Sequence, residues 1–196
     1  FCRRHDLFLI SDEVYREFCY TEEPHFSAMN IPGCEQNVIL ADSVSKRYNL
    51  CGARIGCIVS HNKDVMAAAL KFAQSRLCPP VLGQYAAIGA LDTPQSYFDE
   101  VKAEYIRRRD CAVRMLNAMP GVFAPTPYGA FYTVVELPVD DAEDFARWML
   151  TDFSMDGATT MVTPATSFYK TPGAGRNHAR IAYVLEVPEL EKALNI

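Results

Sequence analysis

The sequence contains a single tryptophan, no long run of apolar residues and no long run of charges of one sign. Without about 18 consecutive apolar residues, no segment is expected to span a membrane. The formal net charge of -5 is spread along the chain, so no basic surface for nucleic acid or anionic lipid is expected. What is present, 49% hydrophobic and 22% charged residues, is typical of a globular protein and favours small-molecule chemistry.

Cysteine and histidine usage gives no sign of a disulfide framework or a metal site. The seven cysteines are odd in number and never occur as C-x-x-C, and the four histidines lack metal-ligand spacing. We therefore expect no bound metal. We also expect a location in the reducing cytoplasm.

The sequence lacks an initiator methionine and has no signal-peptide pattern at its start. It begins shortly before the apolar run at residues 7–10, and it ends, at residues 193–196, inside a predicted helix. These features predict a fragment that is cut at both ends.

Short apolar runs over residues 7–10 and 37–41 predict parallel strands buried on both faces. A third run covers residues 54–59. Polar residues follow the first two runs, among them Asp12 and Ser43. Because ligands of open α/β sheets bind beyond the carboxyl ends of the strands, these positions are where chemistry is expected.

Helical spacing, caps and prolines predict the rest of the α/β fold. The expected helices cover residues 64–77, 81–91, 94–119 and 142–153, the last of these behind the acidic cap Asp140-Asp141, and a final helix begins near residue 188. Strands are expected at 130–137 and 178–185. This order favours an incomplete, mainly parallel-sheet large domain over residues 1–112. A small α+β domain over residues 113–196, truncated at its end, is expected to follow it through the long helix.

The densest group of candidate functional residues lies between positions 42 and 56. Ser43, Ser45 and Arg54 are residue types that bind phosphate, and Lys46 stands among them. Helix caps and a surface lysine would explain the same residues without any ligand. Arg180 interrupts an apolar strand and needs an anionic partner, either a ligand or a protein carboxylate.

Four motifs in this order resemble those of class I and II aminotransferases, the pyridoxal-phosphate enzymes of the aspartate aminotransferase fold type. They are S-D-E-x-Y at 11–15, D-S-x-S-K-x-x-x-x-x-G-x-R-x-G at 42–56, G-A-F-Y at 129–132 and A-R-I-A-Y at 179–183. The resemblance covers essentially the whole chain. It implies the C-terminal half of such an enzyme, with residues 1–112 as part of the cofactor-binding large domain.

The resemblance implies a role for each candidate residue. Lys46 would carry pyridoxal phosphate and move a proton. Asp12 would pair with the protonated pyridine nitrogen. Tyr15 would hydrogen-bond the 3′ oxygen of the cofactor, and Arg180 would bind the α-carboxylate of the substrate. The phosphate positions would be Ser43, Ser45 and Arg54.

The implied activity is transfer of an amino group between an L-amino acid, with aspartate as the first choice, and a 2-oxo acid. Two alternatives stay open: a carbon-sulfur lyase that uses the same cofactor, and the ligand-sensing domain of a transcription regulator. The resemblance further implies a homodimer. Because part of the cofactor site would lie outside the chain, we expect the isolated chain to show little or no transamination.

Overall fold

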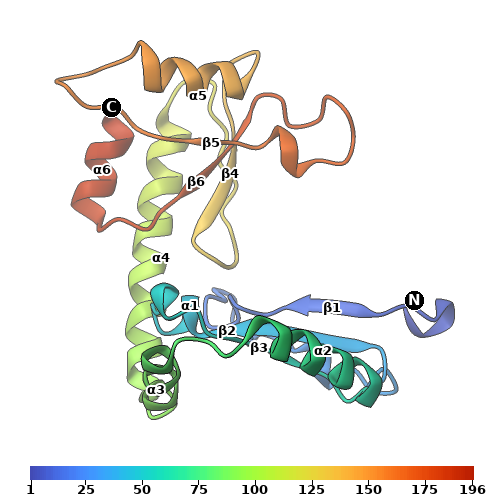
Figure 1. Ribbon diagram of the computed structural model, residues 1–196. Coiled ribbons are helices and arrows are strands. Elements are labelled where there is room, and N and C mark those ends of the chain that lie inside the picture. The colour runs from blue at the N-terminus through green and yellow to red at the C-terminus, as the bar shows by residue number, and fades with distance from the viewer. The chain divides into compact units, whose positions relative to one another are not determined.

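The computed structural model describes all residues from 1 to 196, and the chain divides into two compact units (Figure 1). The units are Phe1–Asp99 and Glu100–Ile196, so the division lies inside helix α4, Gln95–Ala118. The sequence predicted the boundary later, between residues 112 and 113. A helix satisfies its own backbone hydrogen bonds, so its apolar spacing does not mark where one unit ends and the next begins.

The first unit contains a three-stranded sheet in the order β1-β2-β3. Strand β1 (Leu9–Asp12) runs parallel to β2 (Val38–Ser43), whereas β3 (Gly56–Val59) runs antiparallel to β2. This portion of the sheet is therefore mixed. All three predicted strands are present, and β1 begins two residues later than its apolar run.

The expectation that the strands are buried on both faces is wrong for this unit. Val38 and Leu40 of β2 are buried, but Ile10 of β1 is 70% exposed and every residue of β3 is exposed. An apolar run shows that a strand is suited to burial. Whether a face is covered depends on the neighbouring elements, and the sequence of the strand does not contain that information.

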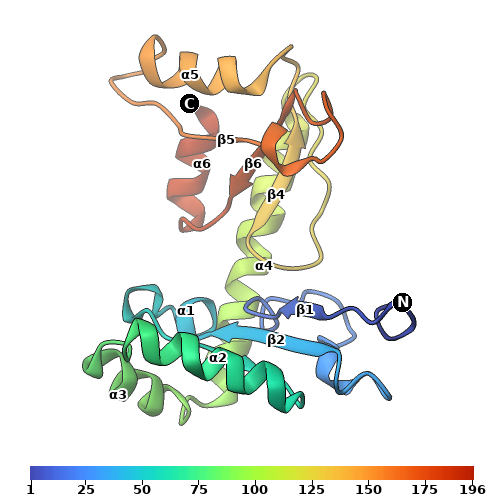
Figure 2. The same ribbon diagram turned by 45° about the vertical axis from the view of Figure 1, so that its right-hand side comes forward.

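Helices α2 (Lys63–Arg76) and α3 (Val81–Ala90) follow the sheet. The side chain of Asn62 caps α2 by accepting hydrogen bonds from the backbone N–H groups of Asp64 and Val65, both at 3.1 Å. The predicted ends of both helices are confirmed to within one residue. Helix α2 runs along the sheet (Figures 1 and 2).

The second unit contains an antiparallel sheet in the order β4-β6-β5. Its strands are β4 (Tyr132–Glu136), β5 (Thr163–Pro164) and β6 (His178–Ala182). Strands β4 and β6 lie where the sequence predicted them, although both are shorter. The fully buried Val135 and Tyr183 belong to the core of this unit.

Helices α5 (Ala142–Thr151) and α6 (Val187–Asn195) complete the second unit. Asp141 caps α5, as the acidic residues before that helix predicted. Helix α6 lies beside α4 (Figure 2), where Arg114 Nη2 is 3.5 Å from Glu191 Oε1. No helix in the structure combines the length and the apolar character needed to cross a membrane.

Candidate functional site

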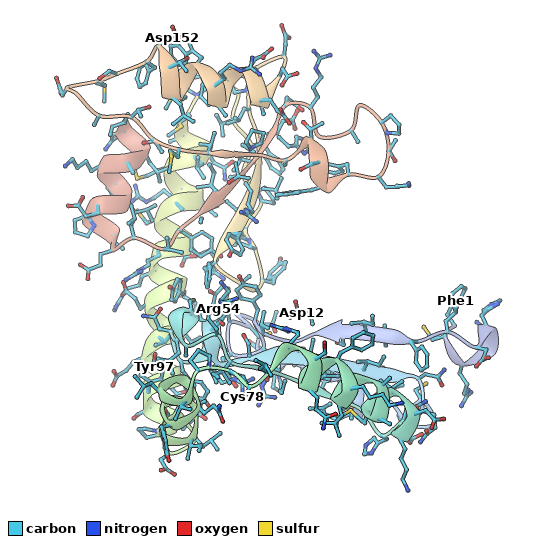
Figure 3. The ribbon with its side chains drawn as sticks, in the orientation of Figure 1. Phe1, Asp12, Arg54, Cys78, Tyr97 and Asp152 are labelled. Atoms are coloured by element: carbon cyan, nitrogen blue, oxygen red, sulfur yellow. The ribbon has the colours of Figure 1, made fainter.

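The candidate residues of the first unit lie at one edge of its sheet. Asp12 is the last residue of β1 and pairs with Ala41, while Ser43 is the last residue of β2. Because these strands are parallel, their carboxyl ends meet at the same edge. Lys46 follows directly in the short helix α1, Val44–Arg47. Figure 3 shows Asp12 and Arg54 at this end of the sheet, where α1 begins.

The Asp12 carboxylate is exposed at this edge. Its Oδ1 accepts a hydrogen bond from the backbone N–H of Val14 at 3.2 Å, which fixes the start of the following turn. No arginine, lysine or histidine nitrogen lies within 4.0 Å of it. The carboxylate can therefore receive a cationic group of a ligand.

Lys46 and Tyr15 lie next to each other. The Lys46 Nζ is 5.9 Å from the centroid of the Tyr15 ring, and both side chains are partly buried. An ammonium at this distance from an aromatic face is attracted by the quadrupole of the ring. The tertiary structure thus brings together two residues that are 31 positions apart in the chain (46 minus 15).

Ser43 and Ser45 carry hydroxyls at the start of α1. Ser43 Oγ caps this helix by accepting a hydrogen bond from the Ser45 N–H at 3.3 Å, so the helix-cap interpretation is correct for Ser43. The Ser45 hydroxyl makes no hydrogen bond within the chain. It remains available as a donor to a ligand.

Arg54 adopts a left-handed backbone conformation with φ 56° and ψ 40°, which is rare for a residue with a side chain. It follows the 3-10 turn η3 (Cys51–Ala53), and its only hydrogen bond, from Nη1, goes to the Cys51 carbonyl at 2.9 Å. No carboxylate lies within 4.0 Å of the guanidinium. Two residues later, Gly56 pairs with Ser43, so the sheet register brings this segment to the start of α1.

The chemistry of these groups fits pyridoxal phosphate. An arginine without a carboxylate partner and a free serine hydroxyl are donors suited to a phosphate dianion. The exposed carboxylate of Asp12 suits a protonated ring nitrogen, and Tyr15 and Lys46 supply a phenol and a primary amine at the same sheet edge. A rare backbone conformation at Arg54 is of the kind that concentrates at functional sites.

Glu13 is a residue of this region for which the sequence assigned no role. Its side chain is buried, and it accepts hydrogen bonds from Ser11 Oγ at 3.1 Å, Ser27 Oγ at 3.0 Å and the Ala28 N–H at 2.9 Å, with His25 Nε2 at 3.0 Å. Burial acts to raise the pKa of Glu13, but these hydrogen bonds outweigh it and hold the pKa below its ordinary value. Glu13 thereby fixes the segment that carries Tyr15.

Arg47 is the second residue without an assigned role. Its Nη2 donates to Asp42 Oδ2 at 2.5 Å, and both side chains are largely buried. Burial acts to lower the pKa of Arg47, yet the hydrogen bond and the charge of Asp42 outweigh it and raise the pKa further. A charged residue directly after Lys46 was the available signal, but sequence spacing alone does not identify its partner.

Arg180 belongs to the second unit, on strand β6, opposite Val134 of β4. Its guanidinium carbon lies 4.7 Å from the ring centroid of Tyr132 and 5.4 Å from that of Phe168. No carboxylate lies within 4.0 Å of it, so the salt bridge to a protein carboxylate is not present. Two aromatic rings thus hold a planar cation that is left without an anionic partner.

Comparison with known proteins identifies the family of the chain. The whole chain, residues 1–196, matches the family described as aminotransferase class I and II. It is 32% identical to an aspartate aminotransferase of Pyrococcus abyssi, over 100% of this chain and 49% of that protein. It is 29% identical to aromatic-amino-acid aminotransferase 2 of Thermococcus litoralis, again over 100% of this chain and 49% of that protein.

Solved structures give the same result. The crystal structure of an aromatic aminotransferase from Pyrococcus horikoshii matches with a TM-score of 0.83 and 30% identity, over 99% of this chain and 51% of that one. The chain therefore belongs to the class I and II aminotransferases and has the α/β fold of that family. It spans about half the length of the curated relatives that it matches.

Proposed function

We propose that the protein is a pyridoxal-phosphate-dependent aminotransferase with Lys46 as the residue that carries the cofactor. One observation above all supports this: Lys46, which follows β2, lies beside Tyr15, which follows Asp12 at the end of β1, so two separate segments meet at the same sheet edge in a chain that belongs to this family. When bound, the cofactor supplies an aldehyde that takes up the amino group and an electron-withdrawing ring. The phosphate would be held by Ser43, Ser45 and Arg54.

Each candidate residue of the first unit would have its own role at the cofactor. The Lys46 amine binds the cofactor and then moves the proton of the substrate Cα. The Asp12 carboxylate keeps the ring nitrogen protonated, because an adjacent negative charge favours the charged form. The Tyr15 hydroxyl hydrogen-bonds the 3′ oxygen of the ring. Arg54 offers a two-pronged donor to the phosphate.

Arg180 would bind the α-carboxylate of the amino acid and of the 2-oxo acid. Its guanidinium has no carboxylate partner and lies over the rings of Tyr132 and Phe168, which restrict its movement. Such an arginine forms two parallel hydrogen bonds with a carboxylate.

Aspartate is the amino donor that we propose first, with a 2-oxo acid as acceptor. Relatives named aspartate aminotransferase support this choice, while another relative is named for aromatic amino acids. We also propose a homodimer in the cytoplasm that binds neither nucleic acid nor membrane. The seven unpaired cysteines and the net charge of -5 support the location and the absence of nucleic acid.

The test starts with the complete protein. Pyridoxal phosphate is added, the adduct is reduced with borohydride, and peptides are mapped by mass spectrometry. The label is expected on Lys46 and should disappear in Lys46→Ala. A panel of amino acids with 2-oxoglutarate then identifies the donor. Release of ammonia and pyruvate in place of glutamate would show a lyase, whereas cofactor binding without turnover would favour the ligand-sensing alternative.

A further inference from the structure

Four charged side chains connect the segment after β1 to helix α1. Arg47 Nη2 is 2.5 Å from Asp42 Oδ2, and Arg47 Nε is 3.4 Å from Glu17 Oε1. Arg16 contacts the same two carboxylates: its Nε is 3.3 Å from Glu17 Oε1, and its Nη1 is 3.9 Å from Asp42 Oδ2. We call Arg16, Glu17, Asp42 and Arg47 the charge cluster.

The charge cluster is largely removed from solvent at its centre. The side chains of Arg47 and Asp42 are 13% and 11% exposed, whereas those of Glu17 and Arg16 are 31% and 41% exposed. Arg47 Nε is buried without a hydrogen-bond partner, so its contact with Glu17 is an ion pair without hydrogen-bond alignment. A buried guanidinium needs its carboxylates, because leaving a charge unpaired out of water is costly.

Three of the four members of the charge cluster directly follow Tyr15 or Lys46 in the chain. Arg16 and Glu17 directly follow Tyr15, and Arg47 directly follows Lys46. Asp42 belongs to β2, so it anchors both arginines to the sheet. Arg47 thus pairs with a carboxylate of β2 and with a carboxylate of the segment that carries Tyr15.

We propose that Arg47 is a positioning residue, which holds the Tyr15 segment and helix α1 together through Asp42 and Glu17 and so sets the approach of Tyr15 to Lys46. The inference rests on the proposed function, since it concerns the residues that would carry the cofactor. Ordinary surface ion pairs contribute little to stability, but a partly buried arginine shared between two carboxylates restricts geometry.

The test compares Arg47→Met, Arg47→Lys and Glu17→Gln with the parent in the complete, cofactor-free protein. Pyridoxal phosphate condenses with lysine amines, with loss of water, and borohydride reduces the resulting imine to a stable secondary amine. Mass spectrometry follows the initial rate of labelling at Lys46 relative to Lys63 of α2. Arg107→Met is the matched control, because Arg107 is exposed and pairs only with Glu104 of its own helix.

The expected result is a roughly tenfold lower Lys46-to-Lys63 ratio in Arg47→Met and a roughly threefold lower ratio in Glu17→Gln, within the usual range for coupled neighbours. Arg47→Lys should recover part of the loss, because an ammonium keeps the charge but lacks the fork that spans two carboxylates. Arg107→Met should match the parent. In a Tyr15→Leu background, Arg47→Met should change the ratio by less than twofold or so.

If Arg47 only stabilises the fold, Arg47→Met should have a lower melting temperature and an unchanged Lys46-to-Lys63 labelling ratio. That result would overturn the inference. If Arg47→Met does not fold, the more exposed Glu17→Gln decides the question on the same ratio. If the parent shows no preference for Lys46 over Lys63, the proposed function fails. If the parent prefers Lys46 over Lys63 and no charge-cluster variant alters that preference, only the positioning role of Arg47 fails.

Discussion

The Lys46 ammonium faces the ring of Tyr15 at 5.9 Å from its centroid. Tyr15 lies in the turn after β1, and Lys46 lies in the helix after β2, so the parallel pairing of these two strands creates the contact. A phenol beside a lysine amine can both orient the amine and offer a hydrogen bond to whatever the amine binds.

Tyr15→Phe tests whether the phenol hydroxyl offers a hydrogen bond to the group that Lys46 binds. The ring is kept, so covalent capture of pyridoxal phosphate at Lys46 is expected to persist. Loss of one hydrogen bond to the cofactor, worth about 1.4 kcal/mol, should lower kcat/KM for transamination about tenfold. Steady-state kinetics and peptide mapping on the same sample measure both quantities. An unchanged kcat/KM would remove the hydroxyl from the mechanism.

Arg54→Gly separates stability from cofactor binding. Glycine adopts φ 56° without strain, and that relief of about 1 kcal/mol offsets the greater backbone entropy of glycine in the unfolded chain. The free energy of unfolding is therefore expected to change by less than about 0.5 kcal/mol. Affinity for pyridoxal phosphate should fall about 100-fold, because charged hydrogen bonds to the phosphate are lost.

Denaturant unfolding and an absorbance titration with the cofactor measure these two effects. Arg54→Lys serves as the companion variant, since it keeps the positive charge but loses the paired N–H donors of the guanidinium. Its affinity for pyridoxal phosphate should lie between those of the parent and of Arg54→Gly. Equal affinity in all three proteins would show that Arg54 does not bind the phosphate.

Gly83 and Gly89 of α3 form a matched pair of helix positions. A Cβ at Gly83 would lie 2.6 Å from the Ala53 carbonyl oxygen, whereas nothing lies within 4 Å of one at Gly89. Alanine improves helix propensity by about 1 kcal/mol at either site, but overpacking at Gly83 costs about 1–3 kcal/mol. Gly89→Ala should stabilise the protein and Gly83→Ala should destabilise it, as chemical denaturation can measure. Similar stabilities would contradict close packing of α3 on η3.

Glu13 is expected to make stability depend on pH. Its pKa in the folded protein is below the ordinary 4.5, so its contribution is fully present above about pH 4.5 and is lost as the pH falls through the folded pKa. Glu13→Gln should lower the free energy of unfolding at pH 7 by about 1–3 kcal/mol, because four donors lose a charged acceptor. The decline between about pH 5 and pH 3 should become shallower.

Urea unfolding over that pH range gives the comparison. Glu22→Gln, at an exposed position of the segment that follows, is the control and should leave both the stability and its pH dependence close to those of the parent. A Glu13→Gln protein with the parent's pH dependence would mean that the pKa of Glu13 is the same in the folded and the unfolded chain.

Arg180→Lys should weaken binding of both substrates. The guanidinium fork and its stacking on Tyr132 are lost, so KM for the amino acid and for the 2-oxo acid is expected to rise about 30-fold, equivalent to about 2 kcal/mol. Steady-state kinetics measure this, and Arg176→Lys is the control because Arg176 is exposed and pairs with Asp141. Equal rises in both variants would argue against a specific carboxylate contact.

The sequence alone determined the kinds of element and most of their ends. Apolar periodicity placed α2 and α4, Asp141 and Pro188 marked helix starts, and polar residues after apolar runs located the edge where Asp12 and Lys46 lie. These features were predictable because they depend on propensities and hydrogen bonds within a few residues, and because parallel strands leave their carboxyl ends at one edge.

The tertiary structure decided what depends on residues far apart in the chain. Burial of Glu13 requires Ser27 and Ala28, the environment of Arg47 requires Glu17, and the uncovered face of β1 reflects which elements its unit contains. The antiparallel direction of β3 and the division inside α4 likewise follow from packing. A charged side chain has the same sequence signature whether it is solvated or buried, and only its partners in three dimensions determine which state has the lower free energy.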